Sequence, residues 1–79
     1  MTVTLYTREG CCLCEEALKA IRQARARAEF RIEIVDIDSD PELRKLYTDE
    51  VPMIAIDGKK AFKYRVTADE LLRRMRARA

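Results

Sequence analysis

Two stretches of alternating side chains in the first half of the chain predict β-strands. Residues 2–7 alternate threonine with valine and leucine, and residues 30–36 alternate charged residues with phenylalanine and isoleucine. Between them, apolar residues recur at helical spacing along a highly charged segment: Leu13, Ala17, Leu18, Ile21, Ala24 and Ala28. The first half of the chain is therefore expected to run strand, helix, strand.

Capping residues predict two further helices. The segment 38–40, Asp-Ser-Asp, offers helix caps and precedes Pro41, which suits a first helical position, so a short second helix should follow. Near the end of the chain, Thr67 and Glu70 have the spacing of a capping box. This box predicts a last helix whose inward face carries Ala68, Leu71, Leu72 and Met75.

A hairpin is predicted between these two helices. Two β-prone segments, residues 51–56 and 59–64, flank Asp57-Gly58, a pair that favours a two-residue type I′ turn. A turn of this length fixes the strand register, which gives two expected pairs near the start of the hairpin: Ile54 with Ala61, and Met53 with Phe62.

Length and charge narrow the class of protein. Residues 1–79 are enough for one domain and leave no room for a second core. The 16 Lys and Arg residues nearly cancel 14 Asp and Glu residues, so no nucleic-acid partner is expected. Apolar runs are too short for a membrane span, and the first residues lack the pattern of an export signal. A cytoplasmic protein is the expectation.

The cysteines are clustered in a way that indicates chemistry and not cross-linking. Cys11, Cys12 and Cys14 are the only three cysteines, whereas a secreted miniprotein would spread an even number along its chain. They stand where the first strand gives way to the first helix, and free N–H groups at a helix start favour thiolate over thiol. The Cys-x-x-Cys spacing brings the second thiol within reach of the first. We predict that Cys11 is the exposed nucleophile and Cys14 the buried resolving thiol.

Cys12 has two interpretations. It is a candidate accessory thiol, either as a second redox partner or as a metal ligand, because it is expected to be exposed. The alternative is a small residue that fills the gap between the two working cysteines. A Cys11–Cys12 bridge would require a strained backbone, since adjacent side chains point away from each other.

The sequence VTLYTREGCCLC at residues 3–14 resembles the opening of glutaredoxins and small glutaredoxin-like thioredoxin-fold proteins. Val51-Pro52 resembles the second signature of these proteins, and the resemblance covers essentially the whole chain. It implies an α/β minimal thioredoxin fold, in the order β-α-β-α-β-β-α. The four-stranded mixed sheet would have spatial order 2-1-3-4, with the first and third helices on one face and the second helix on the other.

The resemblance also implies roles for individual residues. Cys11 matches the family nucleophile, and Cys14 matches the resolving thiol. Arg8 matches a lysine that favours the thiolate and helps to hold an anionic thiol substrate. Val51 matches the residue whose backbone pairs with substrate as a strand would, and Pro52 matches a cis proline packed beside the cysteines. The implied function is a thiol-disulfide oxidoreductase that reduces protein or small-molecule disulfides without a bound cofactor.

Two departures from the family pattern bear on glutathione. Typical glutaredoxins carry a Gly-Gly pair between the last strand and the last helix, but residues 64–69 contain no glycine. Glu50 replaces the usual threonine, and its charge should repel an anionic tripeptide. We therefore expect weak use of glutathione and better reduction by a thioredoxin-reductase-type or dithiol donor.

Two alternative functions remain open from the sequence. The three clustered cysteines could form a soft-metal module for Cu(I), or could share an iron-sulfur cluster between two chains. Zinc is disfavoured, because the chain has no histidine and no fourth cysteine to close a site. The third class is a non-catalytic interaction module that keeps the fold, although the intact Cys-x-x-Cys argues against it.

Overall fold

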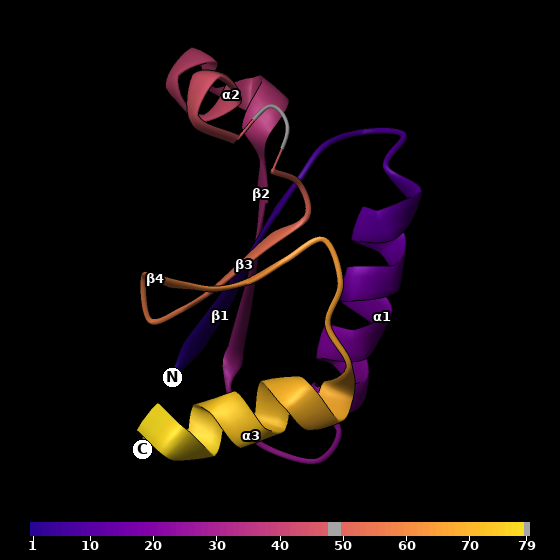
Figure 1. Cartoon of the computed structure of the whole chain (residues 1–79), viewed down its shortest axis with the longest axis vertical. Coiled ribbons are helices and arrows are strands. Elements are labelled where there is room, and N and C mark those ends of the chain that lie inside the picture. The colour runs from indigo at the N-terminus through magenta and orange to yellow at the C-terminus, as the bar shows by residue number, and fades with distance from the viewer. Residues whose placement is uncertain (48–49, 79) are drawn as a thin grey trace.

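The computed structural model describes residues 1–47 and 50–78 of the chain. Its strands are β1 (Thr2–Thr7), β2 (Arg31–Asp36), β3 (Met53–Ile56) and β4 (Lys59–Lys63). Its helices are α1 (Cys12–Arg25), α2 (Pro41–Tyr47) and α3 (Ala68–Arg78), with a 3-10 turn η1 (Ile37–Ser39) between β2 and α2. The element order is the predicted one (Figure 1).

The sheet has the order β2-β1-β3-β4, as predicted. β1 pairs parallel with β2, and the other two pairings are antiparallel. The parallel ladder runs from Thr2 opposite Arg31 to Thr7 opposite Asp36, so both strands end at the same edge of the sheet. The loop that carries the cysteines leaves from this edge.

The hydrophobic core lies between one face of the sheet and the two longer helices. Val3 and Leu5 of β1 point to this face, because side chains two apart in a strand share a side. Ile21 of α1 and Leu71 of α3 pack there and are fully buried. Figure 1 shows α1 beside the sheet and α3 across its lower end.

The second helix is attached differently. α2 contributes no buried side chain. Instead, the Tyr47 ring stacks on Tyr6 with 4.8 Å between ring centroids, and Tyr6 alternates with Leu5 and so belongs to the opposite face of the sheet. The predicted placement of helices on both faces is correct, and α2 sits at the end of the sheet where β1 and β2 finish (Figure 1).

The hairpin has the predicted turn, but its predicted register is wrong beyond the second pair. Asp57 and Gly58 have φ values of 50° and 83°, as a type I′ turn requires. A bulge in β4 then places Ile54 opposite Phe62, not Ala61, and Met53 opposite Lys63, not Phe62. The extra residue brings Phe62 to the core side of the sheet, where it packs with Ile54.

The buried face of α1 also differs from the predicted stripe. Leu13 is 37% exposed, whereas the buried positions of the helix are Cys14, Ala17, Ala20, Ile21 and Ala24. The helix is therefore turned so that the second cysteine of the motif faces the core and Leu13 faces a surface groove. The last helix begins as predicted: Thr67 Oγ1 accepts the Glu70 N–H at 3.1 Å, and Glu70 Oε1 accepts the Thr67 N–H at 3.2 Å.

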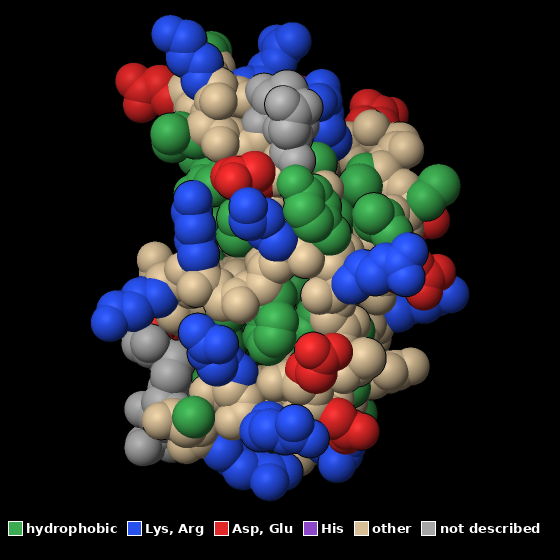
Figure 2. Space-filling view, viewed as in Figure 1, with side chains coloured by type: hydrophobic (Ala, Val, Ile, Leu, Met, Phe, Trp, Pro, Cys, Tyr) green, Lys and Arg blue, Asp and Glu red, His purple; other side chains and the backbone are tan. Residues whose placement is uncertain are grey.

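Surface charge on the face seen in Figure 2 is mixed. Lysine and arginine side chains are spread over this face with acidic side chains among them, and they do not gather into one basic stripe. This distribution agrees with the small net charge of +2.

Candidate active site

The loop between β1 and α1 presents the cysteines. Gly10 has a φ of +79°, a left-handed conformation that glycine adopts at little cost, and it lets the chain turn back into the helix. Cys11 follows as the N-cap residue of α1, with an extended backbone. The residue that begins the Cys-x-x-Cys motif is therefore also the residue that begins the helix.

The two outer cysteines are joined by a backbone hydrogen bond. The Cys14 N–H donates to Cys11 Sγ at 3.2 Å, so the sulfur occupies the place of an N-cap oxygen. Cys11 is half-buried, Cys12 is exposed and Cys14 is only 4% exposed, and none of the three is in a disulfide. The predicted burial of Cys14 is confirmed, whereas Cys11 is half-buried and Cys12 is the exposed cysteine of the three.

Burial holds the Cys14 sulfur in its neutral form. Desolvation raises the pKa of the Cys14 thiol, and hydrogen bonding with the Cys11 thiol raises it further. Hydrogen bonds from the Thr7 side chain and the Arg8 backbone act in the opposite direction without reversing the shift. Cys14 is thus a thiol in the resting protein.

A cavity of about 400 Å³ lies beside the two outer cysteines and is bounded by β1, β2 and the start of α1. Its walls combine apolar and charged side chains. The lining residues other than Cys11 and Cys14 are Leu5, Thr7, Arg8, Glu9, Gly10, Glu15, Leu18, Ile34 and Asp36. Among these described lining residues, three are carboxylates and one is a cation.

That cation, Arg8, forms an ion pair with Asp38. Arg8 Nη2 lies 3.2 Å from Asp38 Oδ1, and Arg8 Nε donates to Oδ2 at 3.4 Å. Arg44 Nε approaches the same Oδ1 at 3.5 Å. Sequence reasoning placed Arg8 at the thiol but considered Asp38, 30 residues away, only as a helix cap.

The Val51-Pro52 segment lies at the same edge of the sheet as the cysteine loop. The β1–β3 ladder ends with Tyr6 opposite Met53. Because the two strands are antiparallel, Pro52, which precedes Met53, lies level with the end of β1. The Val51-Pro52 peptide bond is cis, Pro52 is buried, and its carbonyl oxygen accepts the Tyr64 N–H at 2.8 Å. Val51 is half-buried.

Glu50 is paired with two lysines of β4. Its Oε1 lies 3.1 Å from Lys63 Nζ, and its Oε2 lies 3.9 Å from Lys60 Nζ. These cations offset the repulsion that Glu50 was expected to exert on an anionic ligand. Glu50 is therefore a smaller obstacle to glutathione than its charge alone suggests, and the side chains of residues 64–69 are the main one.

Comparison with known proteins identifies the family. A model of the "Glutaredoxin-like domain (DUF836)" family matches residues 2–76. The chain belongs to this family. A glutaredoxin-like protein of Dictyostelium discoideum is 37% identical over an alignment of 78 residues, with 90% of this chain and 71% of that protein covered.

Solved structures agree with the glutaredoxin-like assignment. Protein XcR50 from X. campestris has a TM-score of 0.80 and is 31% identical, with 95% of this chain and 96% of that chain covered. Protein Ne2328 from Nitrosomonas europaea has a TM-score of 0.74 and is 33% identical, with coverage of 89% and 85%. Thioredoxin 1 of Thermosipho africanus, at 16% identity and a TM-score of 0.71 over 99% of this chain and 93% of that one, shows that the fold is thioredoxin-like.

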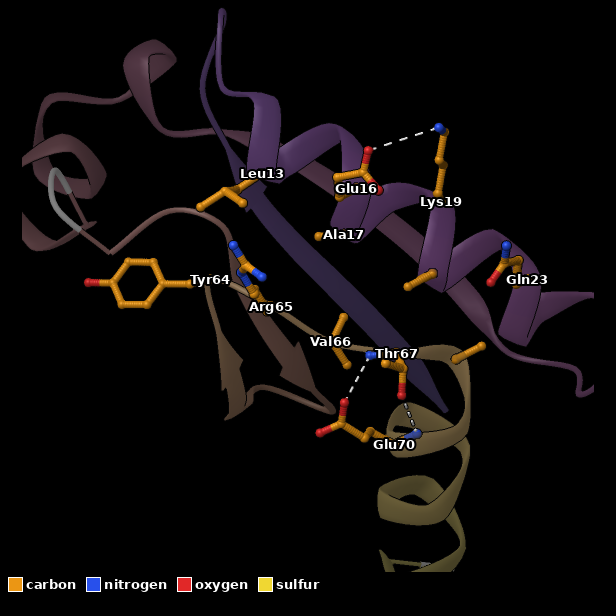
Figure 3. A pocket seen from close by; sticks show the side chains of 12 residues that line it. Leu13, Glu16, Ala17, Lys19, Gln23, Tyr64, Arg65, Val66, Thr67 and Glu70 are labelled. Carbon is orange, nitrogen blue, oxygen red and sulfur yellow. Dashed lines mark hydrogen bonds and ion pairs between the residues drawn. The ribbon is translucent and has the colours of Figure 1, made fainter.

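A larger groove of about 650 Å³ runs along α1 of this glutaredoxin-like chain (Figure 3). Its second wall is the segment from Tyr64 to Ala68, which joins β4 to α3. Leu13, Tyr64 and Arg65 lie at one end, and Thr67 and Glu70 lie at the other. Sequence reasoning missed this groove because Leu13 was counted as part of the core stripe.

Two further findings concern other classes of function. Within the described part of this glutaredoxin-like chain, no three His, Cys, Asp or Glu side chains are grouped so as to hold a metal ion. The soft-metal alternative therefore gains no support from the geometry of the cysteines. Among residues 1–47 and 50–78, no helix combines the length and apolar character that crossing a bilayer demands.

Proposed function

We propose that this glutaredoxin-like protein is a thiol-disulfide oxidoreductase that reduces protein or small-molecule disulfides through Cys11 and Cys14. The observation that carries the proposal is the arrangement of these two residues. Cys11 Sγ is partly accessible and accepts the Cys14 N–H, while the Cys14 thiol is buried directly behind it. This is the asymmetry that a dithiol needs if one sulfur attacks and the other resolves.

In the first step, the Cys11 thiolate attacks one sulfur of the substrate disulfide. A bond forms between Cys11 and that sulfur, the substrate S–S bond breaks, and the other substrate sulfur leaves as a thiolate that takes a proton from water. The N–H group of Cys14 and the start of α1 stabilise the attacking anion before the reaction. The product is a mixed disulfide between Cys11 and the substrate.

In the second step, Cys14 gives its proton to water and attacks Cys11 Sγ as a thiolate. A Cys11–Cys14 disulfide forms, the mixed disulfide breaks, and the second substrate sulfur leaves as a thiolate. The substrate gains two electrons as two thiols, and the protein loses two as its disulfide. Because burial raises the pKa of Cys14, this thiol does not compete with Cys11 for the incoming substrate.

Three residues outside the cysteine motif are assigned to substrate contact: Arg8, Val51 and Pro52. Val51 and Pro52 adjoin the edge of the sheet from which the cysteine loop leaves, so an extended substrate segment could pair with the Val51 backbone. Arg8 lines the cavity beside the thiols and would favour an anionic substrate. For protein substrates, the groove that begins at Leu13 extends the contact surface along α1.

A dithiol donor of the thioredoxin-reductase type would return the oxidised protein to its dithiol form. Glutathione is a weaker candidate, because side chains occupy the segment where typical glutaredoxins carry Gly-Gly. A cycle of this kind requires a reducing compartment, so we place the protein in the cytoplasm as part of the same proposal.

Trapping of the mixed disulfide tests the proposal. Cys14→Ser should accumulate a covalent adduct with a cysteine-containing disulfide peptide, seen by mass spectrometry, because nothing resolves it. Cys11→Ser should form no adduct, and Cys12→Ser should turn over without accumulating one. An adduct that forms through Cys12 or Cys14 in place of Cys11, or none in any variant, would refute the assignment.

A further inference from the structure

The feature of interest is the ion pair that ties the cysteine loop to the turn after β2. Arg8 follows the end of β1, and Asp38 follows the end of β2. Because these strands are parallel and end with Thr7 opposite Asp36, the residues beyond them emerge side by side. The Arg8 guanidinium uses two of its nitrogens on the two oxygens of Asp38, at 3.2 and 3.4 Å.

Asp38 is held in place by its own turn. Asp36 Oδ1 accepts the Asp38 N–H at 2.9 Å, and Ser39 Oγ donates to the Asp36 carbonyl at 2.6 Å. These bonds fix η1 and leave both carboxylate oxygens of Asp38 directed to cations. A fixed carboxylate binds a guanidinium more effectively, since less side-chain freedom is lost.

The same guanidinium side chain belongs to the wall of the cavity that contains the thiols. Among the described residues of that wall, Arg8 is the only cation, while Glu9, Glu15 and Asp36 are anions. A thiolate at Cys11 would therefore form in an acidic surrounding, where Arg8 is the one lining group able to attract it. Asp38 competes with Cys11 for the Arg8 guanidinium.

We propose that Asp38 is a positioning residue that engages the Arg8 guanidinium in an ion pair and so limits the thiolate fraction of Cys11 in the resting protein. The inference rests on the proposed function, in which Cys11 is the attacking sulfur. It adds a residue that neither the motif nor the family resemblance indicates. Asp38 acts through Arg8 and touches no reacting atom.

A double-mutant cycle measures this effect. Each protein carries Cys12→Ser and Cys14→Ser, so that Cys11 alone reacts, and its alkylation rate by iodoacetamide, a neutral reagent, is followed from pH 5 to pH 10. Asp38→Asn should raise the rate below the midpoint about threefold and move the midpoint to lower pH, as expected for one exposed ion pair. In the Arg8→Gln background, Asp38→Asn should change the rate much less.

Two controls separate positioning from simple charge removal. Asp38→Glu keeps the carboxylate and should react as the parent does. Asp40→Asn removes the same charge two residues away, where the carboxylate accepts the Glu42 N–H, and should also leave the rate unchanged. Circular dichroism of each variant establishes that it is folded before its rate is compared.

The outcomes are distinct. If Asp38→Asn accelerates alkylation equally with and without Arg8, the effect is through-space charge and the positioning role is wrong. No acceleration in either background also overturns it. Neither result depends on disulfide reduction, so the mixed-disulfide experiment above judges the proposed function separately.

Discussion

Glu50 and Lys63 form an ion pair across the hairpin base, with 3.1 Å between Oε1 and Nζ. Lys63 thus places a positive charge beside Glu50, the residue directly before Val51-Pro52. The Glu50 carboxylate raises the pKa of Lys63, as expected when an ammonium gains a hydrogen-bonded anion. The negative charge of Glu50 is thus offset by lysines of β4.

The first prediction concerns glutathione. If Glu50 were unpaired, Glu50→Gln should improve a glutathione-coupled disulfide assay by about fivefold, the effect of removing one surface charge. Because Lys63 and Lys60 offset it, we expect a change of less than about twofold. Lys63→Gln, which uncovers the carboxylate, should lower the activity. A large gain from Glu50→Gln would show that the lysines do not compensate.

The second prediction concerns the pH dependence of stability. Burial raises the pKa of Cys14 above its ordinary value of 9.0 in the folded state. Below that pH, both folded and unfolded chains carry the neutral thiol and the stabilisation is complete. Above pH 9.0 the unfolded chain ionises first, so stability falls by up to about 1.4 kcal/mol per pH unit until pH has risen through the folded pKa.

Urea unfolding of the reduced protein between pH 7 and pH 10.5 checks this. Cys14→Ala should show a shallower loss of stability over the alkaline part of the range, and Cys12→Ala should follow the parent. Equal slopes for the parent and Cys14→Ala would contradict the shift.

The third prediction concerns the groove along α1. Leu13→Ser should lower kcat/KM for a protein disulfide substrate by about tenfold, since a buried leucine contact is worth about 1.5 kcal/mol or more. Reduction of a small neutral disulfide should be unaffected. Leu46→Ser is the matched control, because Leu46 is 64% exposed on α2 and does not line the groove. Equal losses from both variants would remove the groove from substrate contact.

The fourth prediction concerns Cys12. Its exposed position at the start of α1 gives it no part in the steps assigned to Cys11 and Cys14. Cys12→Ser should therefore keep kcat/KM for disulfide reduction within about twofold of the parent, as for most surface substitutions. A loss of tenfold or more would make Cys12 an accessory thiol after all.

The periodic parts of the fold were predictable, because they depend on neighbours in the sequence. Strand alternation, the Asp57-Gly58 turn and the Thr67–Glu70 capping box each appear as expected. The bulge in β4 was not predictable, since it depends on Phe62 reaching the core opposite Ile54 of β3. Local patterns cannot report which of two registers buries more apolar surface.

The same division applies to the candidate site. Cys11 and Cys14 take positions at the helix start that the motif alone indicates. The partner of Arg8 could not be found in this way, because Asp38 becomes its neighbour only through the parallel pairing of two strands. Long-range ion pairs leave no periodic signal in a single sequence.

The absence of buried side chains in α2 has a consequence for local unfolding. The helix contacts the rest of the protein through the Tyr6–Tyr47 stack, in which both residues are half-buried, and through Arg44 beside Asp38. Because none of its own side chains is buried, it can open while the core between α1, α3 and the sheet stays intact. Amide protons of residues 42–47 should then exchange with solvent through a subglobal opening of low free energy. Their exchange rates should be insensitive to Ile21→Val, which weakens the core, whereas the slowest amides of β1 should exchange faster in that variant.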